Sequence, residues 1–415
     1  MSYSKTVFFI PVWFDDFKRF SEQMAADARW TVTAAERIKP RYLFHYATNL
    51  ATDGSLFQSY TLKDRSALNV YLYENEMPLK TPPVIEEVRF SCFATGVGFM
   101  EFWVSYTDMS VEEIADFAYL FKKATKPCGK ELPNGARALY DVAQSLLPDK
   151  EAGQLFFAAS ARFKFECNCL HFIHVDGAIP DEAVVKDTLN HLCRSYKTTM
   201  SSNSESVYDM VYEAAAGDFW GGSTEGMVNI VYDPRNDEND PSYYYLHTIK
   251  LDHLSVDYQF LYLLLLNQKY AAVEYIDKVA KALGLNSKEM EKLNRRIIQL
   301  KNVFSFNVVS DDRHFQNVYA KMFKLLEIQS LLADVIENEN QMEVLQNAKH
   351  AKDDRLSNKY LFGISVLTLF SALIDAAAYF DRFHPIRPLA TPLSFVCVAA
   401  VFVGVVAWVI RSGRK

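Results

Sequence analysis

A glycine-rich segment near the middle of the chain combines the residue types that bind a nucleotide. It reads Gly217-Asp-Phe-Trp-Gly-Gly-Ser-Thr-Glu-Gly226 and directly precedes a predicted strand at 227–232. Glycines let a ligand approach the backbone, an indole stacks on a purine ring, and hydroxyl and carboxylate groups hydrogen-bond a ribose. The ligand-binding residues predicted here are Trp220, Ser223, Thr224 and Glu225. The alternative is a structural loop with Trp220 in the core.

A second group of side chains has metal-ligand chemistry: Cys167, Cys169, His171 and His174. The first three alternate along a predicted strand and so share one of its faces. Zinc sites usually use a tight Cys-x-x-Cys turn, so half-buried strand residues are the competing interpretation, and the metal ligands stay unknown. Magnesium held between subunits is the other metal hypothesis, with these carboxylates available: Asp233, Asp237, Asp311 and Asp312.

No catalytic signature accompanies these groups. The sequence contains no Walker loop, no Gly-x-Ser-x-Gly and no His-Glu-x-x-His, the short motifs with known reaction chemistry. We therefore expect a protein that is not an enzyme and has no covalently bound cofactor. The six cysteines, without a secretion signal, indicate reduced thiols.

Charge excludes one class of partner. The chain of 415 residues has a formal net charge of −7 and no dense Lys/Arg face. A nucleic-acid-binding protein usually carries a basic patch, so we expect no nucleic acid partner.

Two apolar runs lie at the C-terminal end. Residues 360–380 carry one charge and residues 389–410 carry none; each is long enough to cross the roughly 30 Å hydrocarbon core as a helix. The short turn 381–388 between them predicts antiparallel neighbours. Lys/Arg-rich flanks, including the basic tail 411–415, predict that both termini are cytoplasmic in a multi-pass inner-membrane protein.

Polar residues recur every three or four positions along the first run: Ser365, Thr368, Ser371, Asp375 and Tyr379. They therefore share a helix face. A carboxylate inside a bilayer costs about 3 kcal/mol and needs a polar partner or water, so several copies around an axis are expected to line a pore. The alternative is that the hydroxyls bond their own backbone and Asp375 reaches the outer interface.

For the remaining chain we expect an α+β cytoplasmic domain over residues 1–250. Its predicted elements include strands at 5–13 and 42–47, a hairpin of the apolar runs 88–94 and 99–106 around Thr95-Gly-Val-Gly98, and a helix that Ser110 caps and that ends at Lys123. Paired cytoplasmic helices follow over 251–310, and one long amphipathic stalk helix is predicted over 311–359, with apolar residues spaced by three and four. About 48 residues at 1.5 Å each would span roughly 70 Å. Such a helix needs partner helices, which favours a homo-oligomer.

This architecture resembles the CorA family, whose members are pentameric cation channels with the first span lining the pore. The family's Gly-Met-Asn motif is missing, since the corresponding place reads Ala377-Ala-Tyr-Phe-Asp381. The chain is more similar to CorA-like membrane effectors encoded beside type III CRISPR systems, which also lack that motif.

The resemblance implies a homopentameric channel in antiviral defence, gated by a nucleotide second messenger such as S-adenosylmethionine-AMP. Its partners would be the lipid bilayer and this small-molecule ligand. The alternatives are a magnesium transporter that uses Mg²⁺, and a membrane-anchored scaffold or enzyme.

Overall fold

The computed structural model describes residues 3–66, 68–73, 81–123, 131–148, 153–156, 166–199, 210–233, 241–280, 287–337, 340, 359–365, 368, 371, 400 and 404. The chain divides into two compact units, Met1–Ile336 and Glu337–Lys415. The sheet and the candidate site lie within the first unit.

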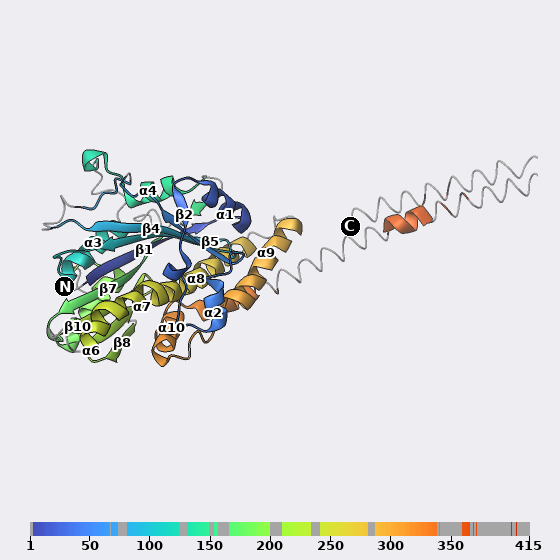
Figure 1. The fold of residues 1–415 in the computed structure, drawn as a ribbon. Helices are drawn as coiled ribbons and strands as arrows, with labels where there is room; N and C mark the ends of the chain where they lie inside the picture. Colours follow the sequence, from blue (N-terminus) through green and yellow to red (C-terminus); the bar gives the residue numbers. More distant parts are fainter. Residues whose placement is uncertain are drawn as a thin grey trace, which may run out of the picture. The chain divides into compact units, whose positions relative to one another are not determined.

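One ten-stranded mixed sheet organises the first unit (Figure 1). Its strand order is β2-β3-β4-β5-β1-β7-β10-β9-β8, with β6 paired to β1. The β7–β10 pair is parallel and the other strand pairs are antiparallel. The strands are β1 Tyr3–Trp13, β2 Trp30–Val32, β3 Phe57–Leu62, β4 Val84–Phe93, β5 Val97–Ser105, β6 Gln154–Leu155, β7 Asn168–Asp176, β8 Met210–Ala215, β9 Asp218–Gly222 and β10 Gly226–Asp233.

One face of the sheet is a continuous apolar core. It packs against α1 Phe17–Ala26, α3 Val111–Lys123, α4 Leu139–Leu146 and α5 Glu182–Arg194. Figure 1 shows α1 and α4 above the strands. Phe8 of β1 contacts Phe121 of α3 edge-on, with ring centroids 4.8 Å apart. Ser110 and Glu113 exchange hydrogen bonds at the start of α3, forming a capping box.

The other face is covered by a helix that runs from Pro241 to Ala280. It comprises α6 Pro241–Tyr244, the π-helical segment η5 Tyr245–Ile249, α7 Lys250–His253, the π-helical segment η6 Leu254–Tyr258, and α8 Gln259–Ala280. Phe9 of β1 meets Tyr262 of α8 edge-on at 5.5 Å. The chain continues with α9 Ser287–Gln299, the π-helical segment η8 Leu300–Phe304 and α10 Arg313–Leu325. Three short helices come earlier in the chain: the 3-10 helix η1 Ala35–Arg37, α2 His45–Leu50 and the 3-10 helix η3 Pro133–Gly135.

This helix-covered face holds a buried carboxyl group. Glu101 of β5 is fully buried and accepts hydrogen bonds from Ser91 Oγ at 2.6 Å and from Gln259 Nε2 at 2.7 Å. Burial raises the pKa of Glu101 above 4.5, while nearby Arg89 acts in the opposite direction. The folded state therefore binds a proton on Glu101 at pH values where the unfolded chain has released it.

Glu101→Gln is expected to remove a pH-dependent loss of stability. Because the folded-state pKa is raised, the contribution of Glu101 to stability is complete below the unfolded pKa and declines as pH rises through the folded one. Glutamine has the same shape and can still accept from Gln259. Urea unfolding between about pH 4 and pH 7 should show a flatter profile for Glu101→Gln than for the wild type. Glu22→Gln, on the exposed surface of α1, is the control, and identical profiles for Glu101→Gln and the wild type would contradict this assignment.

The predicted fold class, an α+β domain followed by a CorA-like stalk and two transmembrane helices, is wrong. Across the described residues, no helix combines the length and the apolar character that crossing a bilayer requires. The most apolar long helix, α8, meets Asn267, Gln268 and Lys269 midway, and its leucines pack inside the fold. A span needs about 20 consecutive apolar residues. The membrane, channel and multi-pass localisation predictions are corrected accordingly.

Most residues of the predicted spans 360–380 and 389–410 lie outside the described residues, as do the turn 381–388 and the tail 411–415. Of the predicted pore residues, Asp375 and Tyr379 also lie outside them, and Ser371 is exposed on a helical position. Ser365 Oγ donates to the Leu361 carbonyl at 2.8 Å, and Thr368 Oγ1 donates to the Ile364 carbonyl at 2.6 Å. Both hydroxyls therefore bond the backbone of their own helix, while the prediction that this stripe lines a pore stays untested.

The helix predicted over 311–359 is interrupted. It begins after Asp312, whose carboxylate accepts from the His314 amide at 2.7 Å, and α10 ends at Leu325. Glu327 then has a left-handed backbone with φ 54°, a conformation that breaks a right-handed helix. Helix resumes over 328–337, and residues 341–358 lie outside the described residues.

Candidate functional site

A cavity of about 900 Å³ lies where β8, β9 and β10 face the N-terminal turns of the long helix and of α10. Its size is within the range of small-molecule sites, which are about 300–1,000 Å³. The segments η5 and η6 both contribute to its wall. π-Helical turns inside α-helices are frequent at functional sites. The lining residues are Tyr42, Tyr212, Ala214, Ala215, Ala216, Asp218, Trp220, Val231, Tyr232, Ser242, Tyr245, Leu246, Lys250, His253, Tyr258, Asp312, Arg313, His314, Phe315 and Asn317.

Aromatic rings form one wall of the cavity. Phe315 is sandwiched between Tyr258, with centroids 4.3 Å apart and planes 13° apart, and Tyr42, at 5.6 Å and 9°. Trp220 contacts Tyr258 at 4.5 Å. These rings come from an N-terminal loop, β9, η6 and α10, so the tertiary fold assembles the wall. Phe315 has neighbouring rings on both faces, so the rings that can stack on a planar ligand are the exposed ones of Tyr42 and Tyr245, which are 42% and 44% exposed.

A buried ion pair lies beside this wall. Lys250 Nζ is 2.5 Å from Asp218 Oδ2, and Asn229 Nδ2 donates to Asp218 Oδ1 at 2.7 Å. Burial lowers the pKa of Lys250, and Asp218 opposes that effect. The pair therefore places hydrogen-bonding polar groups at an otherwise aromatic surface.

The N-terminus of α10 also faces the cavity. Its first amides are already bonded to the Asp312 carboxylate, so a ligand phosphate would have to compete with that side chain. Arg313 lines the cavity, is exposed, and has no ion-pair partner among the described residues. An anionic group would therefore meet Arg313 more readily than the helix end.

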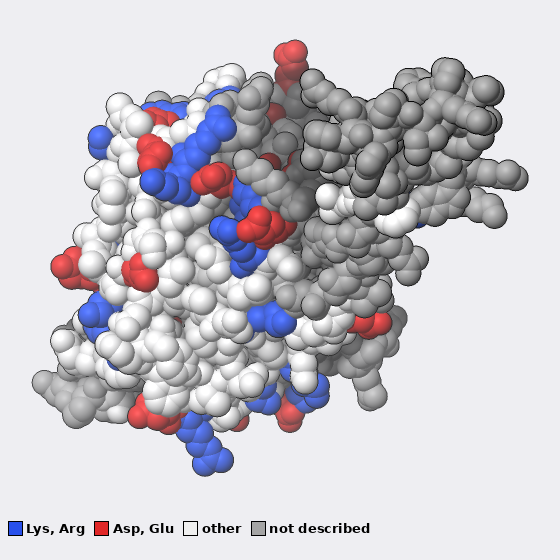
Figure 2. All heavy atoms as spheres, turned by 90° about the vertical axis from the view of Figure 1, so that its right-hand side faces the viewer, with Lys and Arg blue, Asp and Glu red and all other residues white. Residues whose placement is uncertain are grey.

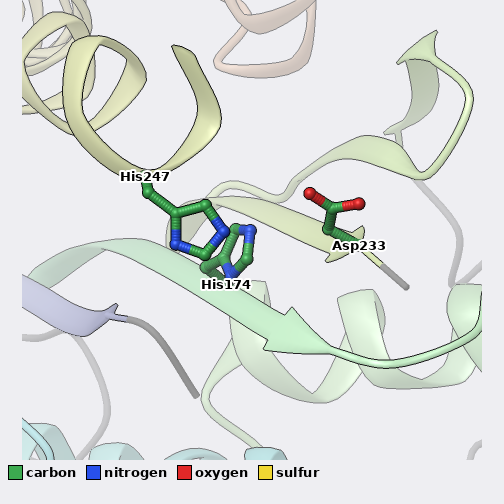
Figure 3. Close-up of side chains that lie close together, drawn as sticks. All are labelled: His174, Asp233 and His247. Atoms are coloured by element: carbon green, nitrogen blue, oxygen red, sulfur yellow. The ribbon is translucent and has the colours of Figure 1, made fainter. Parts of the chain in front are cut away.

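A compact group of potential metal ligands lies next to this region: His174 at the end of β7, Asp233 at the end of β10, and His247 in η5 (Figure 3). One ligand atom from each residue lies within 4.8 Å of the others. The two imidazole rings are side by side with centroids 4.4 Å apart. The parallel β7–β10 pair brings two of the residues together, because His174 is in register with Val231, two residues before Asp233.

His174 is fully buried. Burial and the nearby His247 lower its pKa to about 4, with Asp176 and Asp233 acting in the opposite direction. Its Nδ1 lies 3.4 Å from Asp176 Oδ1. His174 is thus a neutral imidazole at pH 7, the form that binds metal ions.

Of the four ligand-binding residues predicted in the glycine-rich segment, only Trp220 lines the cavity. Trp220 lines the cavity and is also a buried core residue. The other three occupy the turn between β9 and β10, at the opposite end of β10 from Asp233. Ser223 Oγ donates to the Cys193 carbonyl at 2.8 Å, the Thr224 carbonyl accepts from Lys269 Nζ at 3.1 Å, and Glu225 pairs with the buried Lys122 at 3.0 Å. Each of these contacts is structural.

The cysteine–histidine group is not brought together either. Cys169 and His171 lie on the apolar-core face of the sheet, where Thr6 Oγ1 and His171 Nδ1 are 2.7 Å apart. Burial raises the pKa of Cys167, which disfavours the thiolate that a metal needs. Only His174 points to the opposite face.

The predicted magnesium carboxylates are scattered. Asp312 caps α10, Asp311 is exposed, Asp233 belongs to the histidine group, and Asp237 lies outside the described residues. Sequence reasoning missed His247, Lys250 and Asp218. The sequence signal for His247 and Lys250 was weak, since they are only a histidine and a lysine three residues apart before an apolar helix. Asp218 lies in the glycine-rich segment but was not selected there.

Comparisons of this chain with protein-family models, with curated proteins and with solved structures find no match. The functional argument therefore rests on the geometry of the cavity and its surroundings.

Proposed function

We propose that this chain is a ligand-binding protein whose cavity holds a nucleotide-class molecule with its purine ring against the aromatic wall. The stacked Tyr42–Phe315–Tyr258 wall beside the Lys250–Asp218 pair carries the proposal. A purine supplies a planar ring for stacking and edge groups for hydrogen bonds. The resemblance to CRISPR-associated effectors would make the molecule a second messenger, such as S-adenosylmethionine-AMP.

The charges at the cavity fit a ligand with few negative charges. Lys250 and Arg313 are balanced by Asp218 and Asp312 among the lining residues. Figure 2 shows acidic and basic side chains interspersed on the described part of one face, between large uncharged areas. A single phosphodiester suits such a setting better than a triphosphate or a nucleic acid strand, both of which need a concentrated basic surface.

Tyr245 offers the cleanest test of ligand binding. It lines the cavity, is 44% exposed, and follows Tyr244, which is 59% exposed and does not line it. Removing an aromatic ring that stacks on a base costs about 1–3 kcal/mol. Tyr245→Ala should therefore weaken binding by roughly tenfold to a hundredfold, while Tyr244→Ala should bind as the wild type does.

The measurement is isothermal titration calorimetry of the purified chain with AMP, S-adenosylmethionine and S-adenosylmethionine-AMP. We expect micromolar or tighter binding of at least one. Arg313→Ala should weaken binding of the ligands that carry a phosphate and leave S-adenosylmethionine unaffected. The absence of binding heat with all three ligands, or equal affinities for the two tyrosine variants, would contradict the proposal.

A further inference from the structure

His174, Asp233 and His247 have the ligand types and spacing of a transition-metal site. Two imidazoles and one carboxylate suit zinc and its neighbours, whereas Mg²⁺ prefers oxygen ligands alone. The three ligand atoms lie within 4.8 Å of one another. Around a tetrahedral ion with bonds of about 2.0–2.2 Å, ligand atoms are about 3.4 Å apart. Small side-chain rotations would close that difference.

Three imidazole nitrogens in this group are buried without a hydrogen-bond partner among the described residues. They are His174 Nε2 and His247 Nε2, which could both bind one ion, and His174 Nδ1, which lies beside Asp176. Leaving a buried polar atom unsatisfied costs about 1–3 kcal/mol, and a metal ion bound by both Nε2 atoms would remove that cost for them. His174 is itself fully buried and lies on β7, a central strand of the sheet.

The surroundings of His174 support the same role. Asp176 Oδ1 lies 3.4 Å from His174 Nδ1. A carboxylate at the far nitrogen of a metal-binding histidine is a recurrent arrangement, because it orients the ring and leaves the other nitrogen for the ion. Tyr243 stacks on His247 at 3.9 Å and 22°, and Tyr3 contacts His174 at 5.3 Å. These rings hold both imidazoles in place.

We propose that His174, Asp233 and His247 bind one divalent transition-metal ion, with zinc as the best match. Three protein ligands leave one tetrahedral position for water or for an atom of a bound molecule. The proposal is independent of the nucleotide cavity, because its ligand atoms and its test involve no nucleotide. The charged groups nearest to it are Asp176 and Lys250, and Lys250 is already paired with Asp218.

The test uses the purified full chain, stripped with a chelator and titrated with Zn²⁺ or Co²⁺ without nucleotide. We expect one equivalent of Zn²⁺ to bind with micromolar or tighter affinity, and Co²⁺ to give the intense visible bands of a tetrahedral complex. His247→Ala should weaken Zn²⁺ binding at least about a hundredfold, and Asp176→Asn by about tenfold, as for groups that orient a ligand. His247 is only half-buried, so its variant should fold.

His45→Ala is the matched control, because His45 is an exposed helical histidine far from the group in sequence. It should bind Zn²⁺ as the wild type does. Circular dichroism of the metal-free His247→Ala variant checks its folding, and Asp233→Ala provides a second ligand deletion. The proposal is overturned if the wild type binds no Zn²⁺ at micromolar concentrations, if a folded His247→Ala variant binds it equally well, or if Co²⁺ shows the weak spectrum of a six-coordinate ion.

Discussion

Asp218→Ala is expected to destabilise the protein by about 3–5 kcal/mol, because it leaves the ammonium group of Lys250 buried without its carboxylate. The side chains of Lys250 and Asp218 are 6% and 15% exposed, and their charged atoms are 2.5 Å apart. Asn229 Nδ2 loses one of its two acceptors in the same variant and keeps the Phe219 carbonyl. The loss should appear as a lower urea midpoint with an unchanged slope.

The pH dependence of this variant identifies its cause. Burial lowers the pKa of Lys250 below 10.5, and Asp218 opposes the shift, so removing Asp218 lowers this pKa further. When a base has a lower pKa in the folded state, the unfolded chain binds more protons, and stability rises with pH through that window. The deficit of Asp218→Ala should therefore shrink as pH rises toward 10.5.

An exposed ion pair provides the control. Glu182 and Lys186 lie 2.5 Å apart on α5, with the Glu182 side chain 82% exposed. Glu182→Ala should cost less than about 0.5 kcal/mol. Replacing both partners of the buried pair, as in Asp218→Leu with Lys250→Met, should recover most of the stability. If Asp218→Ala and Glu182→Ala lost similar amounts of stability, the buried pair would contribute no more to the free energy of unfolding than an exposed one.

Local sequence signals predicted much of the central sheet. The apolar runs 88–94 and 99–106 around Thr95-Gly-Val-Gly98 form the hairpin β4–β5, and the run 5–13 is the central strand β1. Ser110 marked the start of α3, because an N-cap serine is recognised from the residues beside it. Such features depend on neighbouring residues alone, so one sequence is enough to find them.

Features set by distant contacts were missed. The run 42–47 was predicted as a strand, but His45–Leu50 is a helix, and the amide of Phe44 donates to the Val309 carbonyl at 2.8 Å. The continuous helix predicted over 311–359 is interrupted at Glu327, whose backbone is left-handed. The sequence has no proline or glycine there that would indicate a break. The two apolar C-terminal runs suggested a membrane protein from hydropathy alone.

The cavity is the clearest example of a feature that depends on contacts between residues distant in the sequence. Tyr42, Trp220 and Phe315 are far apart in the sequence and meet only because the sheet order and the long helix place them there. Trp220 was predicted as a ligand contact in a glycine-rich loop, with a core position as the alternative. The structure shows it on β9, buried in the core and also lining the cavity.

Trp220→Ala is expected to cost about 3–5 kcal/mol of stability, as for other fully buried aromatic side chains. Trp220 has no exposed surface and is the largest fully buried side chain of the described residues. Its loss would leave Tyr258 without a neighbouring ring on one side, at the place where the aromatic wall begins. Ligand affinity should fall in the same variant, so stability and binding must be separated.

Trp103 allows that separation. It is nearly fully buried on β5, contacts the guanidinium of Arg89 at 4.5 Å, and does not line the cavity. Trp103→Ala should lose a similar amount of stability and keep wild-type ligand affinity when titrated at a temperature where it is folded. Trp220→Phe should recover part of both properties, because a ring remains against Tyr258. If Trp103→Ala weakened the ligand as much as Trp220→Ala, the effect would come from general destabilisation, and the aromatic wall would not be the binding surface.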